Sequence, residues 1–143
     1  RREMYMVYPA LIDTVGDVAS IVGSTATTKL ALGILKPTLT SIKQHLTEVG
    51  GAWIASLIMF TVYSIVPLFT CGTFTLANFP RFAVLLYMTN LLSVLPMVLI
   101  AYSVAMLTYW RSLDPDNFVN PIESSLADAI TTLSLFSVVS ILA

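Results

Sequence analysis

The sequence predicts an all-α integral membrane protein, a polytopic helical bundle of about four spanning helices with one short interfacial helix. Of its 143 residues, 57% are hydrophobic and only 10% are charged, whereas a soluble domain carries about 25% charged residues. The mean hydropathy is +0.86, and the apolar runs are long enough to cross a bilayer as helices. We therefore expect a multi-pass protein of the cell membrane that contacts lipid. The net charge of -1 argues against nucleic acid as a partner.

The first span is predicted at residues 4–33 and is apolar on one side only. A polar stripe recurs there at helical spacing, and its members are Asp13, Asp17, Ser20, Ser24 and Thr27 or Thr28. The small residues beside the stripe would let another helix approach closely; they are Gly16, Ala19, Gly23 and Ala26. We expect this helix to line a pore and to pack tightly against a partner, with Pro9 breaking or kinking its entry.

A connector is predicted at residues 34–51. Apolar residues at helical spacing favour a short amphipathic helix at the membrane interface; they are Leu39, Ile42, Leu46 and Val49. The pair Gly50-Gly51 is expected to end this helix. We expect His45 to be solvated rather than to bind a metal.

Two uncharged spans follow, at residues 52–76 and 82–110. A tight turn containing Asn78, Pro80 and Arg81 is predicted between them. The amide of Asn90 is expected to hydrogen-bond to a neighbouring helix, as polar side chains do inside membrane bundles.

The fourth span is predicted to begin at Asn120 and to run to Ala143. Asn120 suits an N-cap, Pro121 the first helical position and Glu123 the third, a variant of the capping box. Glu123 is therefore interpreted as a helix cap rather than a ligand. The preceding polar loop and the connector carry the basic residues Arg111, Lys36 and Lys43, and the positive-inside rule places both on the cytoplasmic side.

Asp128 lies inside this apolar fourth span. A charged group at membrane depth costs roughly 2.5–3.5 kcal/mol on insertion scales, so it indicates function by default. Hydroxyl groups lie three or four residues away along the helix; they belong to Ser124, Ser125, Thr131 and Thr132. A carboxylate among hydroxyls favours a wet surface that faces cations.

Two motifs resemble the MgtE family of magnesium channels and transporters, in particular its archaeal and animal solute-carrier branch. The first is the stretch 9–17, which runs from Pro9 to Gly16-Asp17 and precedes a hydroxyl-rich helix. The family has a proline, a Gly-Asn pair and a similar helix there. The second begins with Asp114-Pro115 and continues through Pro121 to Asp128, an order and spacing of residues that the family shares. With the spans between them, the resemblance covers nearly the whole chain.

The resemblance implies a helical membrane domain that dimerises around an ion path lined by the helices of these motifs. Asp128 matches the family's pore aspartate and Gly16 its glycine, whereas Asp17 stands where the family usually has Asn. Bacterial members have five membrane helices behind cytosolic regulatory domains. Four spans and no such domain are predicted here, so we expect residues 1–143 to be a transport domain that is a fragment or one repeat of a longer chain.

We therefore predict that the chain transports a divalent cation, with Mg²⁺ the favoured ion, as a homodimer or as paired repeats. The predicted metal-binding residues are Asp128, Asp17 and Asp13. The residues predicted to line the path are Gly16, Ser20, Ser24, Ser124, Ser125, Thr131 and Thr132. Two alternatives stay open, namely a Na⁺- or H⁺-coupled Mg²⁺ exchanger and a non-conducting subunit that packs through the Gly16 and Gly23 face. The residues show no catalytic nucleophile with its base and no phosphate-binding glycine loop, so we do not expect an enzyme.

Overall fold

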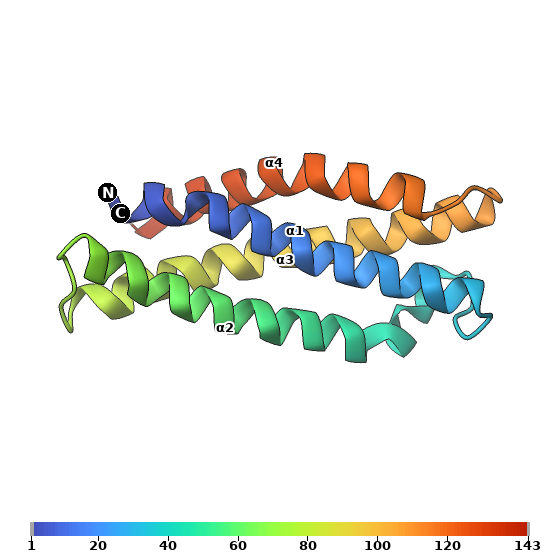
Figure 1. Ribbon diagram of the computed structural model, residues 1–143, viewed down its shortest axis with the longest axis horizontal. Coiled ribbons are helices and arrows are strands. Elements are labelled where there is room, and N and C mark those ends of the chain that lie inside the picture. Colours follow the sequence, from blue (N-terminus) through green and yellow to red (C-terminus); the bar gives the residue numbers. More distant parts are fainter. Residues whose placement is uncertain (1, 143) are drawn as a thin grey trace.

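The computed structural model describes residues 2–142, which form an elongated bundle of four long helices (Figure 1). Successive long helices run in opposite directions, and a short 3₁₀ helix precedes the second of them. The elements are α1 (Arg2–Ala31), η1 (Leu39–His45), α2 (Leu46–Thr70), α3 (Asn78–Trp110) and α4 (Asp116–Leu142). All four α-helices are long and apolar enough to cross a membrane. The predicted fold class is confirmed, and the chain is a multi-pass membrane protein.

Helices α1 and α3 form the centre of the bundle. Each packs against the three other long helices, while α2 and α4 lie on opposite sides of this central pair (Figure 1). The largest fully buried side chains come mainly from the central helices and include Leu11, Val22, Leu86, Met97 and Met106. Although α1 is central, Asp13, Asp17 and Ser24 of its polar stripe are exposed, so the stripe lies on the side of α1 that the neighbouring helices leave uncovered.

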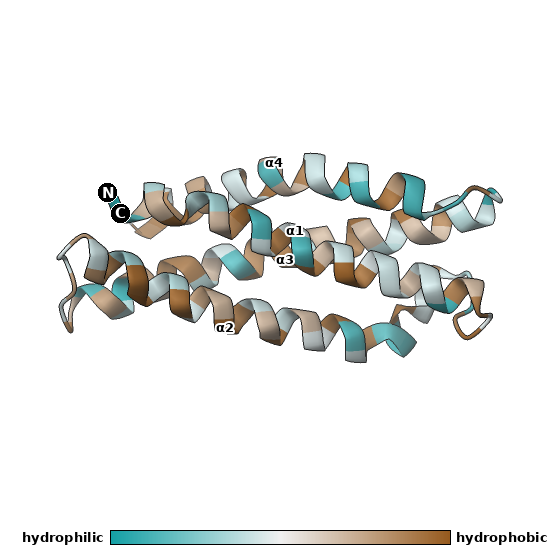
Figure 2. Ribbon diagram, in the orientation of Figure 1, coloured by the Kyte–Doolittle hydropathy of each residue, from teal (hydrophilic) through white to brown (hydrophobic). Residues whose placement is uncertain are grey.

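The outside of the bundle is also apolar. Figure 2 shows hydrophobic residues spread over the outer faces of the helices, and among the exposed ones are Ile58 on α2, Leu99 on α3 and Phe136 on α4. In a bilayer such side chains face lipid tails, which are as apolar as they are. The exterior is therefore that of a lipid-exposed bundle.

Asn90 connects α3 to α2 inside the bundle. Its Oδ1 accepts a hydrogen bond of 2.8 Å from Trp53 Nε1, and its Nδ2 donates one of 2.5 Å to Ser56 Oγ. Asn90 itself is fully buried. The predicted interhelix role of this amide is confirmed.

Three predicted helix boundaries are wrong. Helix α2 begins at Leu46 and continues through Gly50-Gly51, and α3 begins at Asn78 and includes Pro80 and Arg81. A glycine costs a helix only about 1 kcal/mol relative to alanine, and burial of the helix in a bundle outweighs that. The first helical N–H groups have no intrahelical partner, so Pro80 removes nothing from the first turn. Helix α1 continues unbroken through Pro9, so of the two predicted effects of this proline the break does not occur.

Helix α4 begins at Asp116 rather than at Asn120. Asp114 supplies the start signal, because its Oδ1 accepts a hydrogen bond of 3.2 Å from the backbone N–H of Asp116. An aspartate followed by a proline is itself a favourable helix start. Here the helix starts after Asp114-Pro115 and not at the predicted start, Asn120-Pro121. The end of the predicted span, Ala143, lies outside the described residues.

His45 is fully buried rather than solvated, which corrects the sequence prediction. Its Nε2 lies 3.1 Å from the carbonyl oxygen of Val22 and 3.0 Å from Thr25 Oγ1. Beside it, the ammonium group of Lys29 forms an ion pair with Glu48. The connector therefore folds back on α1. The predicted amphipathic helix that includes Leu39 and Val49 is divided between the 3₁₀ helix η1 and the start of α2 at Leu46.

Candidate functional site

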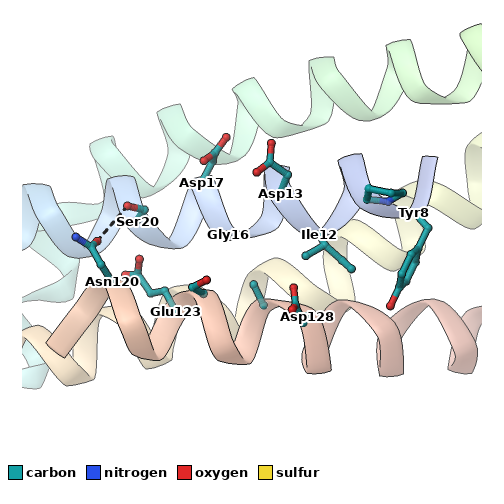
Figure 3. Close-up of a pocket in the computed structure, with 12 residues that line it drawn as sticks. Tyr8, Ile12, Asp13, Gly16, Asp17, Ser20, Asn120, Glu123 and Asp128 are labelled. Atoms are coloured by element: carbon teal, nitrogen blue, oxygen red, sulfur yellow. Dashed lines mark hydrogen bonds between the residues drawn. The ribbon is translucent and has the colours of Figure 1, made fainter. Parts of the chain in front are cut away.

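A polar groove of about 610 Å³ lies between α1 and α4 near the middle of the bundle (Figure 3). From α1 it is lined by Tyr8, Pro9, Ile12, Asp13, Gly16, Asp17 and Ser20, and from α4 by Asn120, Glu123, Ser124, Ala127 and Asp128. The two halves come from the two motifs singled out in the sequence. A single helix pair therefore brings them together.

The α1 side of the groove is the front part of the predicted polar stripe. Asp13, Asp17 and Ser20 are three or four residues apart, so they share one face of the helix. The carboxylates of Asp13 and Asp17 project from the same side of α1 (Figure 3), and both side chains are exposed. Two acidic groups on adjacent turns give this wall of the groove a negative potential.

The α4 side supplies the third exposed carboxylate, Asp128. Figure 3 shows it projecting from α4 into the space between the two helices, near Ile12. The hydroxyl of Thr132 donates a hydrogen bond of 2.5 Å to the carbonyl oxygen of Asp128 and lies 2.6 Å from the hydroxyl of Tyr8. The side chain of Asp128 remains available to the groove.

Small residues allow the two helices to approach. A Cβ added at Gly16 would lie 3.6 Å from the Cβ of Ala127, an ordinary van der Waals contact. A Cβ added at Gly23 would overlap Val119 and would lie 2.6 Å from Glu123 Oε1. The sequence expectation of a tightly packed small-residue face is met here by α4 of the same chain.

Glu123 is the buried member of the groove lining, with 2% of its surface exposed. Neither of its carboxylate oxygens has a hydrogen-bond partner among residues 2–142. Its interpretation as a helix cap is wrong, because α4 begins at Asp116 and Glu123 lies well inside the helix. Figure 3 shows its carboxylate directed from α4 toward α1, beside Asn120.

Six of the predicted site residues line the groove, and they are Asp13, Gly16, Asp17, Ser20, Ser124 and Asp128. The other four, Ser24, Ser125, Thr131 and Thr132, lie outside the lining. The Ser24 and Ser125 hydroxyls donate hydrogen bonds to carbonyl oxygens of their own helices. Thr131 is fully buried, and Thr132 is held by Asp128 and Tyr8 as described above.

Tyr8, Asn120 and Glu123 are the polar lining residues that the sequence prediction missed. Ser20 Oγ donates a long hydrogen bond of 3.5 Å to Asn120 Oδ1 across the groove (Figure 3). The signal was present in the spacing, since Asn120, Ser124 and Asp128 recur every four residues and therefore share a helix face. The assumed helix start at Asn120 concealed it.

The groove suits a hydrated cation better than a directly ligated one. Within the described chain, no three His, Cys, Asp or Glu side chains lie close enough to hold a metal ion together. The oxygen atoms that line the groove belong to carboxylate, amide and hydroxyl groups, which bind hard cations. Mg²⁺ dehydrates reluctantly and usually keeps several waters, with one or two carboxylates nearby.

A comparison with protein families matches residues 8–138 to a family model named MgtE, which is described as a divalent cation transporter. Neither the curated proteins nor the solved structures contain a match. The matched range includes both walls of the groove.

Proposed function

Because the chain belongs to the MgtE family of divalent cation transporters, we propose that the groove between α1 and α4 is part of its cation path and that Mg²⁺ is the transported ion. One observation carries the proposal. Three carboxylates, those of Asp13, Asp17 and Asp128, line a single groove between two membrane-spanning helices. Charged groups are costly at membrane depth, and they are retained where they face an aqueous ion path.

The roles of the three carboxylates follow from their placement. Asp13 and Asp17 give α1 a negative wall that raises the local concentration of cations. Asp128 stands on the opposite wall, so a hydrated ion in the groove meets negative charge from both helices. Hydroxyl and amide oxygens from Ser20, Ser124 and Asn120 can hydrogen-bond to the ion's water shell. Such acidic linings favour cations in other pores.

We further propose that two copies of the domain, or two repeats of one chain, work together. The carboxylates of Asp13, Asp17 and Asp128 in the groove are exposed, and the most apolar stretch of α4 is less buried than those of the other three helices. Two-fold symmetry would bring two Asp128 side chains near one axis and double the negative field there. A second copy would then close the path that one copy leaves open.

The alternative of a non-conducting packing subunit receives less support. That hypothesis needs the face of Gly16 and Gly23 for a partner, and α4 of the same chain occupies that face. Coupling to Na⁺ or H⁺ is compatible with the same groove, so flux experiments must separate a channel from an exchanger.

The deciding experiment is Mg²⁺ flux into liposomes that contain the full-length protein, with wild type beside Asp128→Asn. We expect wild type to move Mg²⁺ and the folded variant to be silent. Runs with and without a Na⁺ or pH gradient distinguish a coupled exchanger, whose flux depends on the gradient, from a channel. A variant that conducts like wild type would remove Asp128 from the path. If neither moves Mg²⁺, the same vesicles are tested with Mn²⁺, Co²⁺ and Zn²⁺, and flux of one of these would change the ion but keep the path.

A further inference from the structure

We propose that Glu123 is a further cation-binding carboxylate of the path, at a position separate from Asp128 and shared with Ser20 and Asn120. The ligand would be a divalent cation that keeps part of its water shell. This inference rests on the proposed function, because it assigns a further site to the same groove.

The burial of Glu123 is the first argument. It is 2% exposed, and neither oxygen finds a hydrogen bond within the described part of the chain. A buried carboxylate without a partner is costly, since it loses its hydration without compensation. Such a group is expected to have a function that repays this cost, and binding a cation supplies the missing partner.

Comparison with the other buried polar groups sharpens this point. The amide of Asn90 is paired with Trp53 and Ser56. His45 Nε2 lies 3.1 Å from the carbonyl oxygen of Val22, whereas its Nδ1 and the hydroxyl of Thr131 are buried without a hydrogen-bond partner among residues 2–142, but neither of these atoms belongs to an acidic group. Glu48 has one oxygen without a hydrogen bond in the described chain, Oε2, but its Oε1 forms an ion pair with the ammonium group of Lys29. Among the acidic residues of the described chain other than Glu3, Glu123 alone is deeply buried and has two unpaired carboxylate oxygens.

The surroundings of Glu123 supply oxygen donors and some freedom of movement. Ser20 and Asn120 face each other across the groove beside it (Figure 3), and their hydroxyl and amide oxygens are suited to hard cations and their waters. Gly23 presents no side chain to the carboxylate, whose Oε1 would lie 2.6 Å from a Cβ at that position. The glycine therefore leaves room for the Glu123 side chain beside the groove.

The position is distinct from that of Asp128. Residues five apart on a helix are separated by about 7.5 Å along its axis, which is more than one carboxylate can span. Two cation positions at different depths suit conduction, because an ion must bind well enough to enter and weakly enough to move on. Glu123 lies nearer than Asp128 to the end of the bundle that carries the basic connector and loop (Figure 1).

The test is Mn²⁺ binding to the complete detergent-solubilised protein, followed by the paramagnetic resonance signal of free Mn²⁺ and competed with Mg²⁺. The variants are Glu123→Gln, which keeps the volume of the side chain, and Asp116→Asn, a matched loss of one exposed acidic charge on the same helix outside the groove. We expect Glu123→Gln to weaken one class of sites by about 10- to 100-fold, the range found when a group in the outer shell of a metal is removed. Asp116→Asn should bind as wild type does.

The two proposals fail in different ways. Unchanged Mn²⁺ binding by folded Glu123→Gln, in a protein that transports Mg²⁺ and depends on Asp128, would overturn the Glu123 site and leave the proposed function intact. If that variant also unfolds at the same temperature as wild type, the buried carboxyl group carries no cost of an unpaired charge, and Glu123 is a neutral structural group. A wild-type protein that neither binds nor moves divalent cations would overturn both.

A measurement on wild type covers the case in which Glu123→Gln does not fold. A hydrophobic carbodiimide modifies carboxyl groups in apolar surroundings, and mass spectrometry of the peptides locates the modified residue. We expect Mg²⁺ to reduce the extent of modification at Glu123. Equal extents with and without Mg²⁺, zero included, would overturn the inference.

Discussion

The carboxylate of Glu123 on α4 lies directly against the backbone of Gly23 on α1. The two helices therefore meet at a glycine, which has no side chain, and at a buried acidic group. A Cβ at Gly23 would lie 2.6 Å from Glu123 Oε1 and would overlap Val119. Val119 is itself 1% exposed and branched at its Cβ, so it has little freedom to move. This contact fixes the distance between the two helices whose facing sides form the groove.

Gly23→Ala is therefore expected to destabilise the bundle, whereas alanine at two other helical glycines is not. Overpacking a buried contact costs typically 1–3 kcal/mol, and we expect a loss of this size in the free energy of unfolding. At Gly16 the new Cβ would make only an ordinary contact, and at Gly50 it would meet nothing within 4 Å. Unfolding in mixed micelles, followed by circular dichroism, gives the three values. Equal stability of the Gly23 and Gly16 variants would show that α4 shifts without cost.

Asn90→Ala is expected to lower the free energy of unfolding by about 1–2 kcal/mol, because it removes two interhelix hydrogen bonds worth roughly 0.6 kcal/mol each on average in membrane bundles and leaves Trp53 Nε1 unpaired. Ser93→Ala is the matched control, since Ser93 Oγ bonds only to carbonyl oxygens of its own helix. In a double-mutant cycle, Trp53→Phe and Asn90→Ala should be less than additive. Strict additivity would mean that their hydrogen bond contributes nothing.

Composition and periodicity were sufficient to predict the all-α membrane bundle, because long apolar runs with few charges have only this solution in a bilayer. The same reasoning found the polar stripe on α1 and the interhelix role of Asn90. The stripe follows from the spacing of residues along one helix, and the role of Asn90 from the cost of an unpaired amide in an apolar interior. Neither prediction requires knowledge of how the helices pack.

The helix starts and the environment of Glu123 could not be predicted in this way. Asp114-Pro115 and Asn120-Pro121 are both favourable starts, and only the packed structure shows that the first is used. Choosing the second start made Glu123 a terminal cap. Its burial arises from the approach of α1 at Gly23, a tertiary contact between segments far apart in the sequence. His45 was assigned to solvent for the same reason, since its partners belong to α1.

Asp17→Asn is expected to weaken the apparent affinity of transport without abolishing it. A divalent ion about 6 Å from a carboxylate in water-like surroundings gains roughly 1.4 kcal/mol, which corresponds to about tenfold in affinity. The dependence of flux on Mg²⁺ concentration measures the change, and Asp116→Asn controls for the loss of one charge outside the groove. The difference should shrink at high ionic strength, because Asp17 is exposed and its field is screened. A loss that is complete and insensitive to salt would instead make Asp17 an indispensable ligand.

Ser124→Cys is expected to form a disulfide between two copies of the chain when the single native cysteine, Cys71, is replaced by serine. Ser124 is exposed and lines the groove, and α4 has only 22% of its most apolar stretch buried, compared with 50% for α3. If two copies meet across the groove, cysteines at this position can approach to the roughly 3.5–4.5 Å between Cβ atoms that a disulfide requires. Ile58→Cys is the matched control, since Ile58 is 61% exposed on α2, on the opposite side of the central helices. Oxidation in membranes followed by non-reducing electrophoresis should give a dimer for Ser124→Cys alone. A dimer from the Ile58 variant, with none from the Ser124 variant, would place the interface on α2. Each groove would then face lipid, and the proposal that two copies close the cation path would be wrong.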